Sequence, residues 1–176
     1  IRTVQDLIEA LDEGQVEGLP GFGKKTADNI REGLDFLQRS AGRTPLAPAV
    51  HVAETLSEQI RQFPGVKKLQ LAGSARRGVE TVGDLDLLCE ADDGQKVIRK
   101  FTELSHANQV LAAGKTKGSI IAADPQGREI QVDLRVLPAQ SLGAALMYFT
   151  GSKAHNVRLR ELAIKLVKAV VPEPPE

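Results

Sequence analysis

The chain has 176 residues, of which 41% are hydrophobic but only 3% aromatic, so its core must consist mainly of Leu, Ile, Val and Ala. A single Cys excludes an internal disulfide bond and fits a reducing compartment, and no apolar run reaches the ~20 residues of a membrane-spanning helix. The formal net charge is zero, which argues against a uniformly basic nucleic-acid-binding protein.

The beginning of the chain predicts two helices. Val4, Leu7 and Leu11 recur at helical spacing until Gly14 interrupts the pattern, and a second helix is predicted over residues 24–38. Because the chain starts inside this pattern, with Ile instead of Met, we expect it to be an excerpt of a longer protein.

The turn between these helices, residues 19–27, has the properties of a site for a phosphate backbone. Gly21 and Gly23 permit positive φ and leave the N–H groups of the next helix accessible to a phosphate. Lys24 and Lys25 add positive charge at the same point. An ordinary helical hairpin would need the glycines for the turn alone.

The whole string resembles the helix-hairpin-helix motif, which implies DNA binding without sequence preference. The DNA contacts that it implies are Gly21, Gly23, Lys24, Lys25 and Thr26. In that motif turn carbonyls often hold a monovalent cation, here Na⁺ or K⁺ on Leu19 and Phe22.

The rest of the chain predicts a mixture of helices and strands. Residues 43–48 contain two prolines and are predicted to be a linker, followed by a helix over residues 49–63. Further predicted elements are strands at 67–71, 84–89, 119–123 and 129–136, a helix at 95–104 and helix again from 142, before a Pro-rich tail. The turn at 124–127 makes the last two strands an antiparallel hairpin.

Residues 71–78 follow a strand and open a helix. Gly73 and its small neighbours let the backbone curl around a phosphate, and the Ser74 hydroxyl can donate to it. Arg76 or Arg77 could grip the outer phosphate oxygens. The alternative is a tight strand-to-helix turn with two solvated arginines.

Asp84 and Asp86 stand two residues apart on a predicted strand, so their side chains share one face while Leu85 and Leu87 face the core. Adjacent carboxylates repel each other unless a cation lies between them. A strand that enters from a polar turn could also contain this pair. The Gly-Ser loop, Gly73 and Ser74, however, precedes this pair by about a dozen residues. The whole pattern therefore places a possible phosphate site next to a possible metal site.

Asp133 supplies a third carboxylate from a neighbouring strand, on the face opposite Val132 and Leu134. Arg135 shares the face of Asp133 and could orient a carboxylate from behind. Without the first pair, Asp133 would be an ordinary exposed strand residue.

Oxygen ligands of this kind suit two divalent cations, Mg²⁺ or Mn²⁺. Such a pair can activate a 3′-hydroxyl for in-line attack on an α-phosphate. The predicted metal ligands and catalytic residues are the three carboxylates Asp84, Asp86 and Asp133.

At this point the motifs resemble those of the family X DNA polymerases, of the bacterial type. Residues 73–86 are similar to that family's signature. Residues 148–152, followed by His155, Asn156 and Arg160, are similar to its nucleotide-pocket motif. The resemblance covers nearly the whole chain.

The resemblance implies an α+β fold with three parts. Residues 1–44 would be the helix-hairpin-helix domain, and residues 45–140 a catalytic palm with a nucleotidyltransferase-type mixed β-sheet and flanking helices. Residues 141–176 would begin the nucleotide-selecting domain, called thumb or fingers. Within it, residues 141–170 have five basic residues against one acidic residue, so a local basic patch exists on a neutral chain.

The implied nucleotide pocket consists of Gly73, Ser74, Arg77, Gly83, Tyr148, Phe149, Gly151, Ser152 and Asn156. Ser74, Arg77 and Gly83 would contact the triphosphate. Tyr148 and Phe149 would pack on the sugar, where the backbone disfavours a 2′-hydroxyl.

Further roles follow from the same resemblance. Asn156 would read the minor-groove edge of the incoming base, and Arg160 would contact the template side. The chain departs from the family at Val82, where many relatives have Ser, and Arg43 is the candidate for an arginine that reaches the γ-phosphate.

The implied function is short-gap filling by a DNA-directed DNA polymerase in base excision repair. Primer-template or gapped DNA and deoxynucleoside triphosphates would be its partners, and it would act as a monomer in the bacterial cytoplasm, at the nucleoid and away from membranes. A template-independent nucleotidyltransferase and a non-catalytic DNA-binding module are the alternatives. The helix-hairpin-helix string, with Asn156 and Arg160, favours the templated enzyme, and the carboxylates argue against the non-catalytic module.

Overall fold

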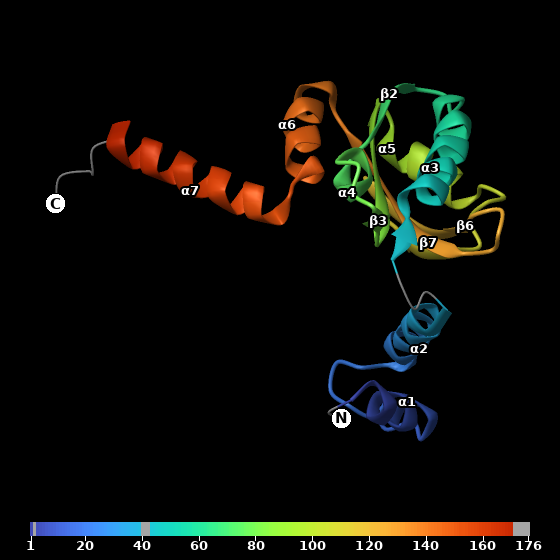
Figure 1. The fold of residues 1–176 in the computed structure, drawn as a ribbon. Coiled ribbons are helices and arrows are strands. Elements are labelled where there is room, and N and C mark those ends of the chain that lie inside the picture. The colour runs from blue at the N-terminus through green and yellow to red at the C-terminus, as the bar shows by residue number, and fades with distance from the viewer. Residues whose placement is uncertain (2, 40–42, 171–176) are drawn as a thin grey trace. The chain divides into compact units, whose positions relative to one another are not determined.

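The computed structural model describes residue 1, residues 3–39 and residues 43–170, and the chain divides into two compact units, Ile1–Gly42 and Arg43–Glu176 (Figure 1). The division into three domains at residues 44 and 140 stays a prediction.

The first unit contains the two predicted helices, α1 (Val4–Asp12) and α2 (Lys24–Arg39). Thr3 caps α1, because its hydroxyl accepts a hydrogen bond from the Asp6 backbone N–H (3.1 Å) and the Asp6 carboxylate accepts one from the Thr3 N–H (3.3 Å). The helices enclose a small apolar core made of Ala10, Leu11, Val16, Ala27 and Leu34.

The second unit is built on a mixed five-stranded sheet in the order β2-β4-β7-β6-β5. Its strands are β2 (Val66–Leu71), β4 (Asp84–Ala91), β5 (Gln109–Ala113), β6 (Lys117–Ala123) and β7 (Glu129–Leu137). The β4–β7 pair is parallel and the other pairs are antiparallel. A two-residue pair, β1 (Thr44–Pro45) with β3 (Thr81–Val82), lies outside this sheet.

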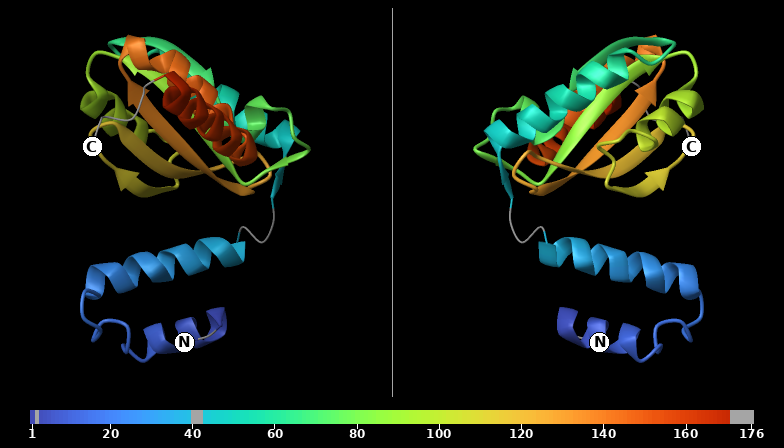
Figure 2. Two further views of the ribbon diagram at one scale, coloured as in Figure 1. Left: turned by 90° about the vertical axis from the view of Figure 1, so that its left-hand side faces the viewer. Right: turned by 90° about the vertical axis from the view of Figure 1, so that its right-hand side faces the viewer.

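Helices cover both faces of this sheet, as the two views of Figure 2 show. On one face, α3 (Leu46–Arg61) and α5 (Gly94–Thr102) pack on the main core, which includes Leu85 and Leu87 with no exposed surface. The predicted inward orientation of these two leucines is therefore confirmed. On the other face, α6 (Ala139–Thr150) packs on β4 through Leu88 and Leu142. The fold is α+β, as predicted.

Three local predictions were wrong. The predicted linker over residues 43–48 is instead β1 and the first turn of α3, which accepts Pro48 because an N–H there has no helical partner. The edge strand β5 was missed, because its exposed residues show no alternating pattern. The C-terminal helix begins at Ala139, and Gly151 separates α6 from α7 (Lys153–Val170).

The Pro-rich tail predicted for residues 171–176 lies outside the described residues. Among the helices that are described, none combines the length and the apolar character needed to cross a bilayer.

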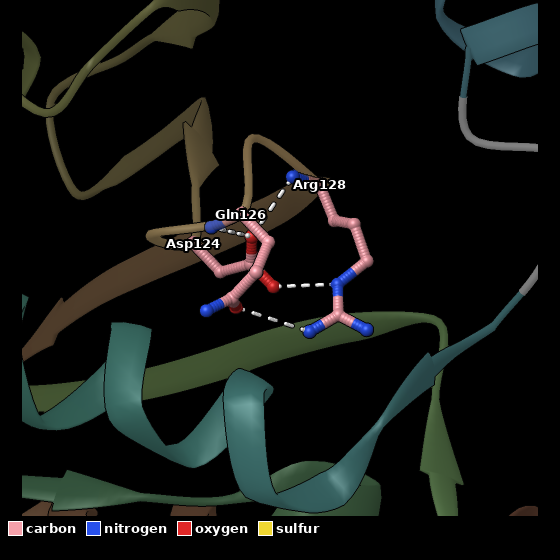
Figure 3. Close-up of polar contacts among 3 residues, drawn as sticks. All are labelled: Asp124, Gln126 and Arg128. Carbon is pink, nitrogen blue, oxygen red and sulfur yellow. Dashed lines mark hydrogen bonds and ion pairs between the residues drawn. The ribbon is translucent and has the colours of Figure 1, made fainter.

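The turn between β6 and β7 is organised by the buried carboxylate of Asp124 (Figure 3). Its Oδ1 accepts hydrogen bonds from the backbone N–H groups of Gln126 and Arg128, both at 2.9 Å, and its Oδ2 accepts one from Arg128 Nε at 2.6 Å. Burial by itself would raise the pKa of Asp124, but these donors outweigh burial and hold the pKa below its ordinary value. The carboxylate thus fixes the hairpin that joins the two strands.

We expect Asp124→Ala to lower the free energy of unfolding by about 2–3 kcal/mol, because three donors lose their acceptor in a buried turn. Gln126→Ala is the matched control, since it removes only an exposed partner of the same arginine. A carboxyl with a lowered pKa stabilises the fold above the unfolded value of 3.8 and loses that contribution as the pH falls through the folded value. Urea denaturation at pH 7 and pH 3 would therefore show a full difference at pH 7 and a smaller one at pH 3. Equal losses at both values would contradict this role of the carboxylate.

Candidate active site

The sheet register brings the three predicted carboxylates onto one face. Asp84 and Asp86 project together from β4, and Asp133 on β7 stands directly opposite Asp86 in the parallel pair. The intervening Leu85 and Val132 are fully buried on the other face. Three carboxylates from two central strands therefore share a small patch of the sheet.

The electrostatics of this patch disfavour a charge on Asp86. Burial, followed by the negative charges of Asp84 and Asp133, raises the pKa of Asp86 to about 6, against the opposing effect of Arg135 and Lys117. A carboxylate in this position is most stable when a cation neutralises it.

Asp133 is held by three donors from its own hairpin. Its Oδ2 lies 2.6 Å from Lys117 Nζ, while its Oδ1 accepts hydrogen bonds from Ser119 Oγ (2.6 Å) and Gln131 Nε2 (2.9 Å). Burial acts to raise the pKa of Asp133, but the bonds from Lys117, Ser119 and Gln131 outweigh it and lower the pKa below its ordinary value. Asp133 is therefore ionised and oriented toward β6.

Lys117 and Ser119 were missed by the sequence analysis, although a signal existed. The hairpin turn pairs Ala123 with Glu129, which places Ser119 opposite Asp133 and Lys117 opposite Arg135. Counting back from the turn would have found both residues.

The chemistry of the donors suits a hard divalent cation. Within the described part of the chain, no three His, Cys, Asp or Glu side chains are arranged as a finished metal site, and Asp133 is paired with Lys117. The loop that begins α4 (Gly73–Arg76) nevertheless lies close beside Asp86. A Cβ on Gly73 would lie only 2.4 Å from Asp86 Oδ2. Only glycine permits this approach of loop and carboxylate. The residues present therefore fit a divalent cation.

A cleft of 410 Å³ lies beside Asp84 and Asp86. Its other lining residues are Gly73, Ser74, Arg77, Tyr148, Phe149, Gly151, Lys153, Asn156 and Arg160. The structure thus brings together every predicted nucleotide-pocket residue except Gly83 and Ser152, which adjoin Asp84 and Gly151 in the chain. Lys153, which was not predicted as a site residue, adds a positive charge to the lining.

Arg77 connects the Gly-Ser loop to the end of α6. Its Nη1 donates a hydrogen bond to the Thr150 carbonyl oxygen at 2.5 Å. A Cβ on Gly151 would lie 3.2 Å from the same nitrogen, and Gly151 has a φ of 73°. The loop and the turn between α6 and α7 therefore meet through a guanidinium and a glycine.

Aromatic residues near the end of α6 form the wall of the cleft. Tyr148 and Phe149 pack edge to face, with 5.2 Å between ring centroids. The Arg135 guanidinium carbon lies 4.7 Å from the centroid of Phe149, so this side chain stacks on the wall while its charge acts on Asp86. Asn156 Nδ2 donates to the Tyr148 carbonyl oxygen at 2.7 Å.

Arg43 lies at the entrance to β4. Its Nε donates to Thr81 Oγ1 (2.9 Å) and its Nη2 to the Thr81 carbonyl oxygen (2.6 Å). A Cβ on Gly83 would lie 3.7 Å from its Nη1. The candidate γ-phosphate arginine thus neighbours a predicted nucleotide-pocket residue.

In the first unit, one of the two glycines of the predicted DNA-binding turn, Gly21, has a positive φ, and Gly23 does not. Gly21 has a φ of 86°, and Gly23 accepts hydrogen bonds through its carbonyl from the N–H groups of Thr26 (2.9 Å) and Ala27 (3.1 Å) as α2 begins. Lys24 and Lys25 are exposed in the first turn of α2. The carbonyls of Leu19 and Phe22 belong to the same turn, and that of Leu19 already accepts the Phe22 N–H at 2.9 Å.

The chain is similar to proteins that are named as DNA polymerases. It is 35% identical over 163 residues to DNA polymerase/3′-5′ exonuclease PolX of Bacillus subtilis (strain 168), an alignment that covers 93% of this chain and 28% of that protein. It is 26% identical over 165 residues to DNA polymerase lambda of Rattus norvegicus, covering 84% of this chain and 28% of the relative. For DNA polymerase lambda of Arabidopsis thaliana the identity is 25% over 195 residues, with 93% and 36% covered.

The chain spans about a third of the length of the curated relatives it matches, at most 36%. No family model matches the chain.

Proposed function

Because the chain belongs to the family X DNA polymerases, we propose that it carries the nucleotidyl-transfer site of a DNA-directed DNA polymerase. The proposed reaction adds deoxynucleotides to a primer 3′-hydroxyl during short-gap repair, including base excision repair. The observation that carries the proposal is the cleft that joins the Gly-Ser loop to Asp84 and Asp86 on β4, with Asp133 opposite Asp86 on the adjacent strand. A phosphate cradle and a set of oxygen ligands in one cleft are what in-line attack on an α-phosphate requires.

Asp84, Asp86 and Asp133 would hold two divalent cations, Mg²⁺ or Mn²⁺. When bound, such cations favour ionisation of the primer hydroxyl and neutralise charge on the phosphates. The side chains of Asp84 and Asp86 would do this from one strand, and Asp133 would approach from the next.

The Gly-Ser loop would bind the triphosphate. The Ser74 hydroxyl and the Arg77 guanidinium both line the cleft and offer donors to phosphate oxygens. Gly73 keeps the loop close to Asp86, so that phosphate and cation would be neighbours. Arg43, with the adjoining Gly83, would extend this contact to the outermost phosphate.

The end of α6 and the start of α7 would select the nucleotide. Tyr148 and Phe149 would pack on the sugar, with Gly151 and Ser152 forming the turn beneath them. Asn156 would then read the minor-groove edge of the base. Arg160 lines the same cleft and would meet the template side.

The helix-hairpin-helix unit would hold the DNA. Exposed Lys24 and Lys25 and the accessible N–H groups at the start of α2 suit a phosphate backbone. A Na⁺ or K⁺ ion on the carbonyls of Leu19 and Phe22 would strengthen that contact. The proposed partners are primer-template or gapped DNA and deoxynucleoside triphosphates, and the proposed setting is the bacterial cytoplasm at the nucleoid, as a monomer.

Primer extension with and without a template strand tests the function. A templated polymerase should incorporate only the nucleotide complementary to the next template base, and should need a divalent cation. Untemplated extension at a similar rate would favour the template-independent transferase. DNA binding without extension would favour the non-catalytic module.

Gly21→Val is expected to weaken binding to primer-template DNA by about tenfold, with little dependence on sequence. A β-branched side chain is strained at a φ of 86° and would stand between the turn and the phosphates. Gly14→Val is the matched control, because Gly14 also has a positive φ (71°) and open space around it. Fluorescence anisotropy with labelled duplex DNA would measure both affinities. An equal loss in the two variants would show that the turn acts through folding alone.

A further inference from the structure

Lys117 makes the closest approach of any cationic group to the predicted metal ligands among the described residues. Its Nζ lies 2.6 Å from Asp133 Oδ2, and the two side chains are 39% and 12% exposed. We propose that the Lys117 ammonium is a placeholder for a divalent cation at Asp133, and that its displacement sets the affinity of the site for that cation. This inference rests on the metal assignment made under the proposed function.

Both oxygens of Asp133 are engaged from β6 and β7. Ser119 and Gln131 occupy Oδ1, which leaves Oδ2 to Lys117. A divalent cation would need to approach an oxygen to about 2.1 Å, and two positive charges so close together repel strongly. The ammonium and the cation therefore exclude each other at Asp133.

The length and exposure of Lys117 allow it to leave. Lysine carries a compact charge on a flexible stem, and this side chain is more than a third exposed. Asp133, by contrast, is fixed by its position on a central strand between β4 and β6. The lysine would move away, which would leave Oδ2 of Asp133 to the cation.

A nearly buried carboxylate needs a countercharge at all times. In the cation-free chain Lys117 supplies it, and with a cation bound the metal supplies it. Removal of Lys117 should therefore destabilise the cation-free chain and leave the cation-bound chain little changed. An ion pair with a purely structural role would be missed equally in both states.

The test is Mn²⁺ binding to the whole 176-residue chain without DNA or nucleotide, measured by the electron paramagnetic resonance of free Mn²⁺. Lys117→Met should bind Mn²⁺ about tenfold more tightly than the wild type, because the competing ammonium is gone. The control is Lys115→Met, which removes the same charge two residues away, in the turn between β5 and β6, and should change the affinity by about twofold at most. In an Asp133→Asn background, Lys117→Met should no longer tighten binding.

Two further measurements complete the test, and the first of them does not depend on how well Lys117→Met folds. Lys117→Arg keeps the charge and can bind the carboxylate in a bidentate manner, so it should bind Mn²⁺ more weakly than the wild type. The melting temperature of Lys117→Met should lie below that of the wild type in EDTA, and saturating Mn²⁺ should close most of the gap.

The outcomes separate the inference from the metal assignment. If the wild type binds Mn²⁺ but Lys117→Met binds it no more tightly than Lys115→Met, or if its melting deficit persists with Mn²⁺, the placeholder role is wrong and the metal assignment stands. If none of these variants nor the wild type binds Mn²⁺, the metal assignment fails and the inference fails with it.

Discussion

Asp86→Asn is expected to abolish nucleotide incorporation and, at the same time, to stabilise the cation-free protein. The loss of a metal-binding carboxylate should cost several kcal/mol of transition-state stabilisation, or roughly 10³-fold or more in rate. The gain in stability is expected because burial and the negative charges of Asp84 and Asp133 destabilise the ionised form of Asp86. A neutral amide of the same shape carries no charge and so avoids this repulsion and the cost of burying a charge.

The sign of the stability change follows from the raised pKa. Asp86 stabilises the fold fully only when protonated, below its unfolded pKa of 3.8, and this contribution is lost as the pH rises through about 6. At pH 7.5 its charge is therefore a cost, which Asn does not carry. Since the side chain is partly exposed, solvent screening reduces the expected gain to about 1 kcal/mol.

Single-nucleotide primer extension and thermal melting in EDTA would measure the two effects. Asp92→Asn is the matched control, because Asp92 follows the same strand but is 70% exposed and paired with Lys67. It should leave extension unchanged. If Asp86→Asn extends primers at a rate near that of the wild type, the carboxylate patch is not the catalytic centre.

Gly73→Ala should lower incorporation by roughly a hundredfold, because it moves a catalytic group without removing one. The new Cβ would lie 2.4 Å from Asp86 Oδ2, so the loop or the carboxylate must shift. Gly73 also has a φ of 63°, a conformation that costs a residue with a Cβ about 1–2 kcal/mol.

Gly78→Ala separates the two effects. Gly78 has a similar φ of 68°, and nothing lies within 4 Å of the Cβ that Ala would add. Both variants should lose similar stability in thermal melts, but only Gly73→Ala should lose incorporation and weaken Mn²⁺ binding. Equal losses of activity would mean that backbone strain, and not contact with Asp86, explains the need for glycine.

Much of the site can be predicted from local sequence, because it depends on periodicity within single elements. The two-residue period of a strand places Asp84 and Asp86 on one face and Leu85 on the other, whichever strand lies beside them. The positive φ at Gly21 and the hairpin turn at Asp124 depend on the preferences of a few neighbouring residues. These features were predicted, and the structure contains them.

The contacts between distant segments were decided by the tertiary structure. Strand pairing depends on which hydrophobic faces pack together, so nothing near Asp86 in the sequence states that Asp133 lies opposite it on β7. The same holds for Arg77, whose guanidinium binds the Thr150 carbonyl, and for Arg135 on the ring of Phe149. The residue types of the site therefore follow from the sequence. Their distances, the pKa of Asp86 and the bond between Lys117 and Asp133 exist only once the sheet has assembled, because burial and charge depend on neighbours that the sheet supplies.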